Sequence, residues 1–428
     1  MQLVSLLTSA AILSTVASTP VNVTRTGYIS LPISLDGAVS PLGQSKDEVS
    51  STLSLKEQLF LTDLQIGSSG EQVTVVVDTG SEYLWVMDSN VECDDGKNDC
   101  QQYGSFSTGN SNSFVKDDSM GEFEVAYSSG QKTTGYWAKD DVSLVGASPV
   151  KGFEFGIAEK TSSKFGILGL NFPRDPSKGY SFPQQLHDQG IISRNAYSVF
   201  LNSKSAGQGS IMFGAVDHSK YEGDLVSVPV QYNETFPRIL VNARIDVNNN
   251  GNSVNNGGNE VGYILDTGST RSRLPSSYLN TLTQLLDGTY DEQWHGVSFD
   301  SCSKLDSVVF YVNFYGKTIS IPAKSLDYGT QGGRCLLQLN FDDDLLILGM
   351  DVLRSIYFLV DLDDREVQLA QAKYGDDNAD IEVFQPTGSE LLASSKKDAK
   401  VLEQTSGGSI MVNPIKAVIV GLLLVWFI

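Results

Sequence analysis

Two apolar runs of β-forming residues stand out in the hydrophobic pattern, and each leads into the same four residues. The first stretch is VVVDTGSEYLWV, residues 75–86, and the second is YILDTGSTRSRL, residues 263–274. Each predicts a buried strand that is followed at once by Asp-Thr-Gly-Ser. An aspartate that closes an apolar strand is a poor choice for stability, because its carboxylate must find partners or change its pKa. Two such positions indicate a chemical role.

A second apolar element repeats in the same order. The sequence GILGL, residues 166–170, follows the first Asp-Thr-Gly, and LILGM, residues 346–350, follows the second. Alone, Ile-Leu-Gly indicates no more than the end of a strand. Its recurrence behind the same tetrapeptide predicts two related halves, each with a strand, a DTGS turn and a long β excursion.

Polar and apolar residues alternate from Glu122 to Tyr127, which predicts a half-buried strand. The next residues, SSG at 128–130, are typical of a turn, and strand-forming residues return from Thr133 to Trp137. This stretch therefore predicts a β-hairpin. Tyr127 could also be an ordinary cross-strand aromatic residue.

The composition agrees with a β-rich chain that forms more than one folding unit. Of its 428 residues, 40% are hydrophobic and 9% are aromatic, which is enough for a large core. The 40 Gly, 19 Phe and 17 Tyr favour short strands and tight turns over long helices. We therefore expect a mostly β fold.

Several other chemistries lack the residues that they need. The three His, at 187, 218 and 295, are scattered and no GxSxG occurs, which argues against a Ser-His-Asp hydrolase. Neither CxxC nor paired His spacing occurs, so we expect no metal and no cofactor. No basic stripe indicates nucleic acid as a partner.

Two Asp-Thr-Gly motifs, each with its Ile-Leu-Gly partner, are a highly specific signal. The chain resembles the pepsin-like aspartic proteases, and within them the fungal secreted and GPI-anchored, yapsin-like branch, over roughly residues 58–374. The resemblance implies a mostly β, bilobal pepsin-like fold, with two β-barrel-like lobes and an active-site cleft between them. It places the N-terminal lobe at 58–200 and the C-terminal lobe at 201–374. It also implies peptide or protein substrates, and we expect a monomer.

The chemistry expected of such a site uses Asp78 and Asp266 as a pair that shares one proton. One carboxylate activates water, and one carboxylic acid protonates the peptide carbonyl or the leaving amine, so no covalent intermediate is needed. Like charges at close range keep both from ionising, and the pair titrates as a unit. The other residues expected at the cleft lie beside the aspartates or, as the resemblance implies, on a flap hairpin: Gly80, Gly268 and Ser269; Tyr127, Ser129 and Gly130, with Trp85 as hydrogen-bond donor to Tyr127.

The four cysteines and one glycosylation motif are consistent with export. Four Cys in a secreted chain allow three connectivities, and we expect pairing in sequence order, Cys93 with Cys100 and Cys302 with Cys335. Each disulfide would stabilise the fold by about 3 kcal/mol before strain is counted. Asn-x-Thr occurs at Asn22 and Asn233, and Asn233 is the expected glycan site.

The N-terminal residues are typical of a targeting segment. Residues 1–18 form an apolar run with small residues at its end, which predicts a secretory signal peptide, although the usual basic residue is missing. A buried strand or helix is the alternative. Residues 19–57 stand where the resemblance implies a propeptide, but they carry no dibasic pair for a processing protease. Self-cleavage in acid, or a chain that keeps the segment, are both open.

The C-terminal residues predict a cell-surface anchor. Residues 375–406 are expected to form a solvated stalk. Residues 407–428 end in roughly 12 apolar residues, too few to span a bilayer, and fit a GPI signal that is removed, with Ser406 or Gly407 as the attachment site. A tail anchor that begins at Ile410 is the competing interpretation. The GPI interpretation predicts attachment to the plasma membrane or the cell wall.

The formal net charge of −21 has two interpretations. One is a surface that stays soluble at the cell exterior and loses charge in acid. The other is an acidic cleft that selects basic residues, as the yapsin-like resemblance implies.

Arg271 and Arg273 depart from the family pattern, which has apolar and Thr or Tyr residues after the second motif. An arginine near Asp266 would lower its pKa and disturb the shared proton. Because a buried arginine without a partner is costly, we expect both to face solvent or to pair with carboxylates, and the enzyme to be active. The alternative is a catalytically weakened homologue that acts as a cell-surface binding or wall-structure protein.

Overall fold

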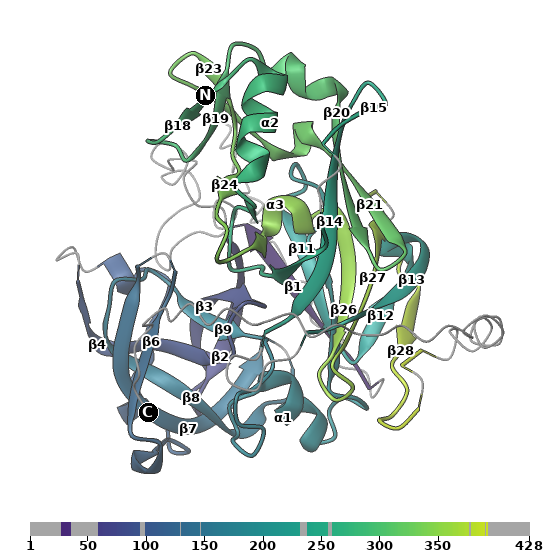
Figure 1. Ribbon diagram of the computed structural model, residues 1–428. Helices are drawn as coiled ribbons and strands as arrows, with labels where there is room; N and C mark the ends of the chain where they lie inside the picture. Colours follow the sequence, from purple (N-terminus) through teal and green to yellow (C-terminus); the bar gives the residue numbers. More distant parts are fainter. Residues whose placement is uncertain are drawn as a thin grey trace, which may run out of the picture.

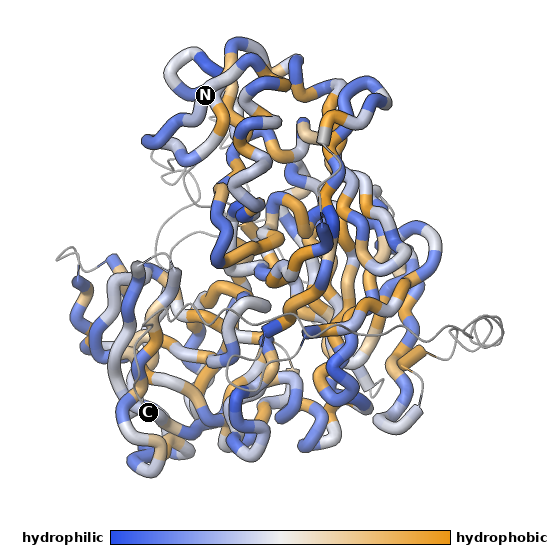
Figure 2. The backbone as a smooth tube through the Cα atoms, viewed as in Figure 1, coloured by the Kyte–Doolittle hydropathy of each residue, from blue (hydrophilic) through white to orange (hydrophobic). Residues whose placement is uncertain are grey.

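The protein folds into two β-rich lobes that share a central sheet (Figure 1). The mostly β, bilobal architecture expected from the sequence is confirmed. Apolar residues concentrate on the strands inside each lobe, whereas turns are hydrophilic (Figure 2). The structure, a computed structural model, describes residues 27–35, 59–94, 99–128, 130–145, 147–231, 238–255, 259–375, 378–389 and 391–392.

The N-terminal lobe is one arm of a large sheet, with strand order β2-β3-β9-β4-β8-β7-β5 and β6 paired to β7. In β3, every residue from Val73 to Asp78 is buried, because both faces of this sheet are covered. Helix α1, Phe182–Asp188, closes the lobe. The strands are β2 Phe60–Ile66, β3 Glu71–Asp78, β4 Leu84–Cys93, β5 Val115–Lys116, β6 Glu122–Ala126, β7 Lys132–Leu144, β8 Val150–Thr161 and β9 Gly166–Gly169.

The central sheet continues from β2 in the order β1-β11-β10-β26-β27-β13 and joins the lobes. Its first strand, β1, lies inside the segment expected to be a propeptide. The apolar residues of ISLPISL alternate and are buried, and the strand pairs with both β11 and β2, so it is part of the core. The strands are β1 Ile29–Leu35, β10 Ala196–Phe200, β11 Gln208–Phe213, β13 Tyr221–Pro229, β26 Ile356–Asp361 and β27 Glu366–Ala372.

The C-terminal lobe has a sheet of order β21-β20-β14-β16-β25-β17-β24, with β15 paired to β14, and a smaller sheet of order β18-β19-β23-β22. Helices α2, Ser277–Leu286, and α3, Met350–Leu353, pack against these strands. The strands are β14 Leu240–Asn249, β15 Asn252–Asn255, β16 Val261–Leu265, β17 Arg273–Leu274, β18 Thr289–Asp291, β19 Gly296–Phe299, β20 Val308–Phe314, β21 Lys317–Pro322, β22 Asp327–Gln331, β23 Arg334–Leu337, β24 Asn340–Phe341 and β25 Ile347–Leu348.

The first part of the expected stalk packs on the folded body instead of extending into solvent. Strand β28, Ile381–Val383, pairs with β12, Ala215–Asp217. Phe384, Leu391 and Leu392 are buried in a cluster beneath the central sheet strands. We expected a solvated stalk from the charged residues of this segment alone. The three apolar side chains explain why the segment packs on the folded body instead. Ser406 and Gly407 lie outside the described residues.

Two disulfides confirm the expected pairing in sequence order. Cys93 at the end of β4 is bonded to Cys100, and Cys302 is bonded to Cys335 of β23. The second links positions 33 residues apart and holds the small sheet of the C-terminal lobe. Asn233, the expected glycan site, lies outside the described residues.

Within the part of the chain that the structure describes, no helix is long and apolar enough to cross a membrane.

Candidate active site

The two Asp-Thr-Gly turns come from equivalent places in the two lobes. Asp78 is the last residue of β3, and Asp266 follows β16 directly. Strand β3 pairs in parallel with β9, and β16 pairs in parallel with β25, so each turn leaves the sheet beside an Ile-Leu-Gly strand. Asp78 is opposite Gly169 in the register, and the Asp266 amide donates to the Leu348 carbonyl at 3.1 Å. The repeat seen in the sequence is therefore a repeat in structure.

The glycine of each Ile-Leu-Gly packs directly under the turn. A Cβ on Gly169 would lie 2.5 Å from the backbone nitrogen of Tyr83, and one on Gly349 would lie 2.7 Å from the carbonyl carbon of Arg271. Such approaches exclude any larger residue. The following residues, Leu170 and Met350, donate backbone hydrogen bonds into the two turns at 2.9 Å. Each glycine strand thus braces the turn that carries an aspartate.

The two aspartates meet across the lobes. A Cβ on Gly80 would lie 2.6 Å from Cγ of Asp266, and one on Gly268 would lie 2.5 Å from Oδ1 of Asp78. The two carboxyls are close enough for the negative charge of Asp266 to act on Asp78. Glycine is required at both positions, because a side chain would displace the opposite carboxyl.

Four reciprocal hydrogen bonds lock the two turns together. The backbone amide of Thr79 donates to Oγ1 of Thr267, and the amide of Thr267 donates to Oγ1 of Thr79, both at 3.0 Å. The Thr79 hydroxyl donates to the Leu265 carbonyl, and the Thr267 hydroxyl donates to the Val77 carbonyl, both at 2.8 Å. Both threonines are buried. Buried, fully satisfied networks of this kind fix one geometry.

Equivalent donors cradle each carboxyl. The Gly80 amide donates to Oδ1 of Asp78 at 2.7 Å, and the Ser81 hydroxyl donates to Oδ2. The Gly268 amide donates to Oδ1 of Asp266 at 2.8 Å, and the Ser269 hydroxyl donates to Oδ2 at 2.8 Å. The structure thus brings Gly80, Gly268 and Ser269 to the aspartates, as the sequence predicted.

The environment of Asp78 favours its protonated form. Burial, and next the negative charge of Asp266, raise the pKa of Asp78 to about 7, although the Ser81 and Gly80 hydrogen bonds act in the opposite direction. Asp78 is 5% exposed. Two adjacent carboxyls in a low-dielectric site cannot both ionise easily, so one proton remains between them in acid.

The expected hairpin is present, and its Tyr127 lies near the first aspartate. Strands β6 and β7 pair antiparallel, from Glu122 opposite Tyr136 to Ala126 opposite Lys132. The Gly130 amide donates to the Tyr127 carbonyl at 2.9 Å and closes the turn. The Trp85 indole donates to the Tyr127 hydroxyl at 2.8 Å, as predicted. Burial and the charge of Asp78 raise the pKa of Tyr127. Ser129 lies outside the described residues.

Comparison with known proteins agrees with this geometry. The family model described as eukaryotic aspartyl protease matches residues 59–372. The chain belongs to the eukaryotic aspartyl protease family. As a member of this family it is an aspartic-type endopeptidase.

Three relatives of this aspartyl protease illustrate the extent of the match. Secreted aspartic protease 3 of Candida albicans is 36% identical over 75% of this chain and 81% of its own length. Secreted aspartic protease 10 of the same organism is 33% identical over 77% of this chain and 75% of its own length. Aspartic proteinase yapsin-3 of Saccharomyces cerevisiae is 30% identical over 84% of this chain and 75% of its own length.

The two unusual arginines of this protease have partners other than the two aspartates. Arg273 forms an ion pair with Asp342 at 3.5 Å and donates to the Ser128 hydroxyl at the flap tip at 3.3 Å. The expected carboxylate partner is therefore confirmed for Arg273. Arg271 instead lies over the Tyr328 ring, 5.7 Å from its centroid, and donates to the Trp294 carbonyl. Among the described residues, neither arginine forms an ion pair with Asp78 or Asp266.

Sequence reasoning missed several residues that hold the catalytic turns. Asp351 accepts from the Ser272 hydroxyl at 2.6 Å and from its amide at 3.0 Å, and so fixes the segment after Asp266. Arg238 donates to the Gly80 carbonyl at 3.4 Å. These partners lie 79 and 158 positions away in the chain, and no short motif links them.

One described group has the spacing of a metal site but cannot act as one. Cys302, Asp327 and Cys335 lie close together, yet the two sulfurs are joined in a disulfide and offer no thiolate.

Proposed function

We propose that the protein hydrolyses peptide bonds by using Asp78 and Asp266 as a general acid/base pair that activates water. The observation that carries this proposal is the pair of adjacent carboxyls, each of which lies against the glycine of the opposite turn and is held by equivalent donors. The raised pKa of Asp78 keeps one proton on the pair over the acid range in which one acid and one base are needed.

The chain's own residues suffice for each proton movement. The ionised carboxylate takes a proton from a water held between the pair, and the protonated carboxyl gives its proton to the peptide carbonyl oxygen. The water oxygen bonds to the carbonyl carbon. The carboxyl that took the proton of the water then gives it to the amine nitrogen as the C–N bond breaks, while the other carboxylate takes a proton back from a hydroxyl of the tetrahedral intermediate. The Gly80, Ser81, Gly268 and Ser269 donors stabilise whichever carboxylate is ionised at each stage.

The test is acid peptidase activity with EDTA present, for wild type and for Asp78→Asn. A mixture of peptides also shows whether cleavage prefers Lys or Arg beside the broken bond. We propose this basic preference from the net charge of −21. An optimum above neutral pH in wild type would contradict the mechanism.

We further propose that Tyr127 is a positioning residue on a flap that covers the dyad and excludes water. The prediction is that Tyr127→Phe lowers kcat/KM about tenfold, because the Trp85 indole loses its acceptor and the flap tip loses its anchor. Steady-state kinetics on one peptide measure the effect. Tyr315→Phe, at an exposed tyrosine of the other lobe, is the control and should act as wild type. If Tyr127→Phe and Tyr315→Phe had the same kcat/KM, the proposed role of Tyr127 on the flap would be wrong.

We propose that the protein enters the secretory pathway and is held at the cell surface by a GPI anchor added at Ser406 or Gly407. Support comes from the terminal sequence pattern, the two disulfides and the secreted relatives. We also propose that the protein is a monomer. We further propose that strand β1 stays with the mature enzyme, because its apolar side chains belong to the core.

The prediction is that phosphatidylinositol-specific phospholipase C releases the protein from membranes, provided that the anchor lipid is of the cleavable kind. A chain truncated after Ala393 should be secreted without treatment. N-terminal sequencing of the released form should begin before Ile29, because β1 remains in place. Mature protein that still carries residues 417–428 would contradict the anchor assignment.

A further inference from the structure

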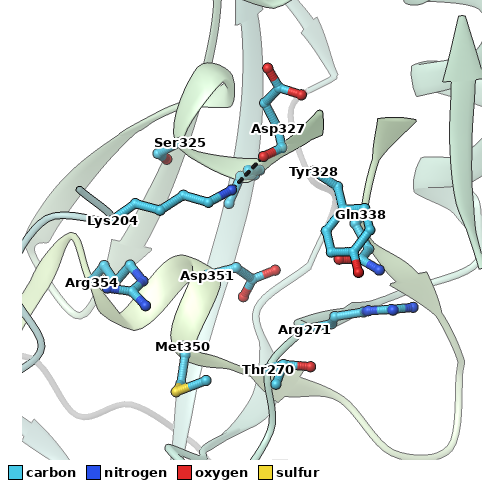
Figure 3. A pocket seen from close by; sticks show the side chains of 11 residues that line it. Lys204, Thr270, Arg271, Ser325, Asp327, Tyr328, Gln338, Met350, Asp351 and Arg354 are labelled. Carbon is cyan, nitrogen blue, oxygen red and sulfur yellow. Dashed lines mark hydrogen bonds between the residues drawn. The ribbon is translucent and has the colours of Figure 1, made fainter. Parts of the chain in front are cut away.

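A cavity of about 80 Å³ lies in the C-terminal lobe beside the turn that carries Asp266 (Figure 3). This volume holds several waters, since one water needs roughly 10–15 Å³ by the same measure. Its walls come from five stretches of the chain. They include Thr270 and Arg271 after the dyad residue, Asp351 and Arg354 at helix α3, Tyr328 on β22 with Gln338 after β23, and Lys204 from the β10–β11 turn.

Cations outnumber carboxylates around this cavity. Lys204, Arg271 and Arg354 line it, and Asp351 is the carboxylate that points inward in Figure 3. Asp327 also lines it, but its carboxylate is turned outward and pairs with Lys324 at 3.0 Å. The cavity therefore carries an excess of positive charge.

The inward carboxylate is already occupied by other donors. Asp351 accepts from the Ser272 hydroxyl, the Ser272 amide and the Val352 amide at 2.6–3.0 Å. Within the described residues, neither Lys204 nor Arg354 forms an ion pair with a carboxylate. The Lys204 ammonium donates to the Asp327 carbonyl, and the Arg354 guanidinium donates to the Ser203 carbonyl at 3.5 Å and lies over the Phe60 ring. Arg354 is 6% exposed, and burial lowers its pKa. A buried guanidinium that has no carboxylate partner favours the binding of an anion beside it.

A separate observation indicates that an acceptor is missing. Gln338 lines the cavity, is 7% exposed, and its Nε2 has no hydrogen-bond acceptor in the part of the chain that the structure describes. Buried amide donors in folded proteins nearly always have a partner, and an unpaired one is costly. An oxygen-bearing anion would accept from Gln338 and from the guanidinium and ammonium groups around it.

We propose that this cavity binds an anionic oxygen group, either a small oxyanion such as phosphate or a carboxylate carried by an acidic side chain of the peptide substrate. Arginine suits such groups because its planar donors match two oxygens at once. Occupancy would act on the dyad, since Thr270 and Arg271 continue the Asp266 turn and Asp351 holds Ser272. The effect on cleavage rests on the proposed peptidase function, whereas binding does not.

The first arm of the test is calorimetric titration of the full chain with inorganic phosphate at pH 5. Wild type should bind one equivalent. Gln338→Leu and Lys204→Gln should each weaken binding about tenfold, because each removes one donor to the anion. Gln338→Leu should not lower the melting temperature, because it removes an unpaired buried amide. Lys116→Gln, an exposed lysine on β5, is the matched control and should bind as wild type.

The second arm uses a neutral peptide that the enzyme cleaves, with one glutamate walked through each position in place of glutamine. If the natural ligand is a substrate carboxylate, kcat/KM should rise about tenfold at one position, and Arg271→Leu and added phosphate should both abolish that rise. If phosphate binds and no glutamate position helps, the ligand is a free oxyanion. Both results support the cavity as an anion site.

The proposal is overturned if neither phosphate nor a glutamate peptide is bound, or if Gln338→Leu and Lys204→Gln bind phosphate like wild type. Cleavage of the neutral peptide separates this outcome from a failure of the proposed function. A protein that binds phosphate in the cavity but cleaves nothing has the anion site without the peptidase role. A protein that cleaves the neutral peptide but binds neither phosphate nor a glutamate peptide has the peptidase role without the anion site.

Discussion

Asparagine in place of either Asp78 or Asp266 is expected to abolish peptide hydrolysis. Asparagine has nearly the shape of aspartate and can accept from the same backbone amides, but it cannot exchange a proton. General acid/base catalysis contributes about 10²–10⁴-fold, so kcat should fall by at least that factor in each single variant. The double variant should be no worse than the worse single one, because the pair acts as a unit.

Steady-state hydrolysis of one peptide at acid pH measures the effect, and thermal unfolding shows whether each variant is folded. Asp141→Asn is the matched control, because this carboxylate pairs with Lys151 at the surface of the N-terminal lobe, away from the dyad turns. The control should keep wild-type activity. A folded Asp78→Asn or Asp266→Asn protein that retains a tenth of wild-type turnover would show that the two carboxyls do not work as a pair.

The catalytic core of the fold was predictable because its signals are local. Asp-Thr-Gly and Ile-Leu-Gly are short, and their order in the chain repeats. The structure explains why glycine is required at Gly80, Gly169, Gly268 and Gly349, where a Cβ would meet backbone or carboxyl atoms. Such close contacts are the reason that the motifs are short and recognisable. The flap hairpin was predictable for the same reason, because its alternation spans few residues.

Long-range packing was not predictable in the same way. Strand β1 alternates like any half-buried strand, but only its pairing with β11, about 180 residues later, places it in the central sheet. The hydrogen bonds between Ser272 and Asp351, and the cation-lined cavity beside them, also need residues that no local pattern connects. Charge near the chain end suggested a stalk, whereas Phe384 and Leu391 decided the packing.

The arginines after the second motif show why residue type alone could not decide their role. The sequence alone did not show whether Arg271 and Arg273 lie close enough to Asp266 to disturb the proton that the two aspartates share. In the structure Arg273 reaches from β17 across to the flap residue Ser128, and Arg271 lies on Tyr328. Arg273 therefore links the C-terminal lobe to the flap, while Arg271 turns toward the cavity. Although Arg271 and Arg273 are only two residues apart, they have different partners, and neither forms an ion pair with Asp78 or Asp266.

The folded protein should lose stability as the pH rises from about 4 to about 7, and Asp78 should account for a large part of that loss. Its pKa is about 7 in the fold, against 3.8 without the fold, so folding takes up a proton in this range. Stability is therefore highest below the unfolded pKa and falls until the folded carboxyl ionises. A rise of about three pKa units corresponds to at most about 4 kcal/mol.

Urea unfolding of wild type and Asp78→Asn at pH 4, 5, 6 and 7 tests this linkage. The variant lacks the titrating group, so the wild-type curve should fall more steeply and the two should separate by a few kcal/mol at neutral pH. Buried Asp351 and Asp361, whose pKa values are also raised by burial, titrate in both proteins and cancel in the difference. Parallel curves would mean that Asp78 takes up no proton on folding, which would contradict its raised pKa.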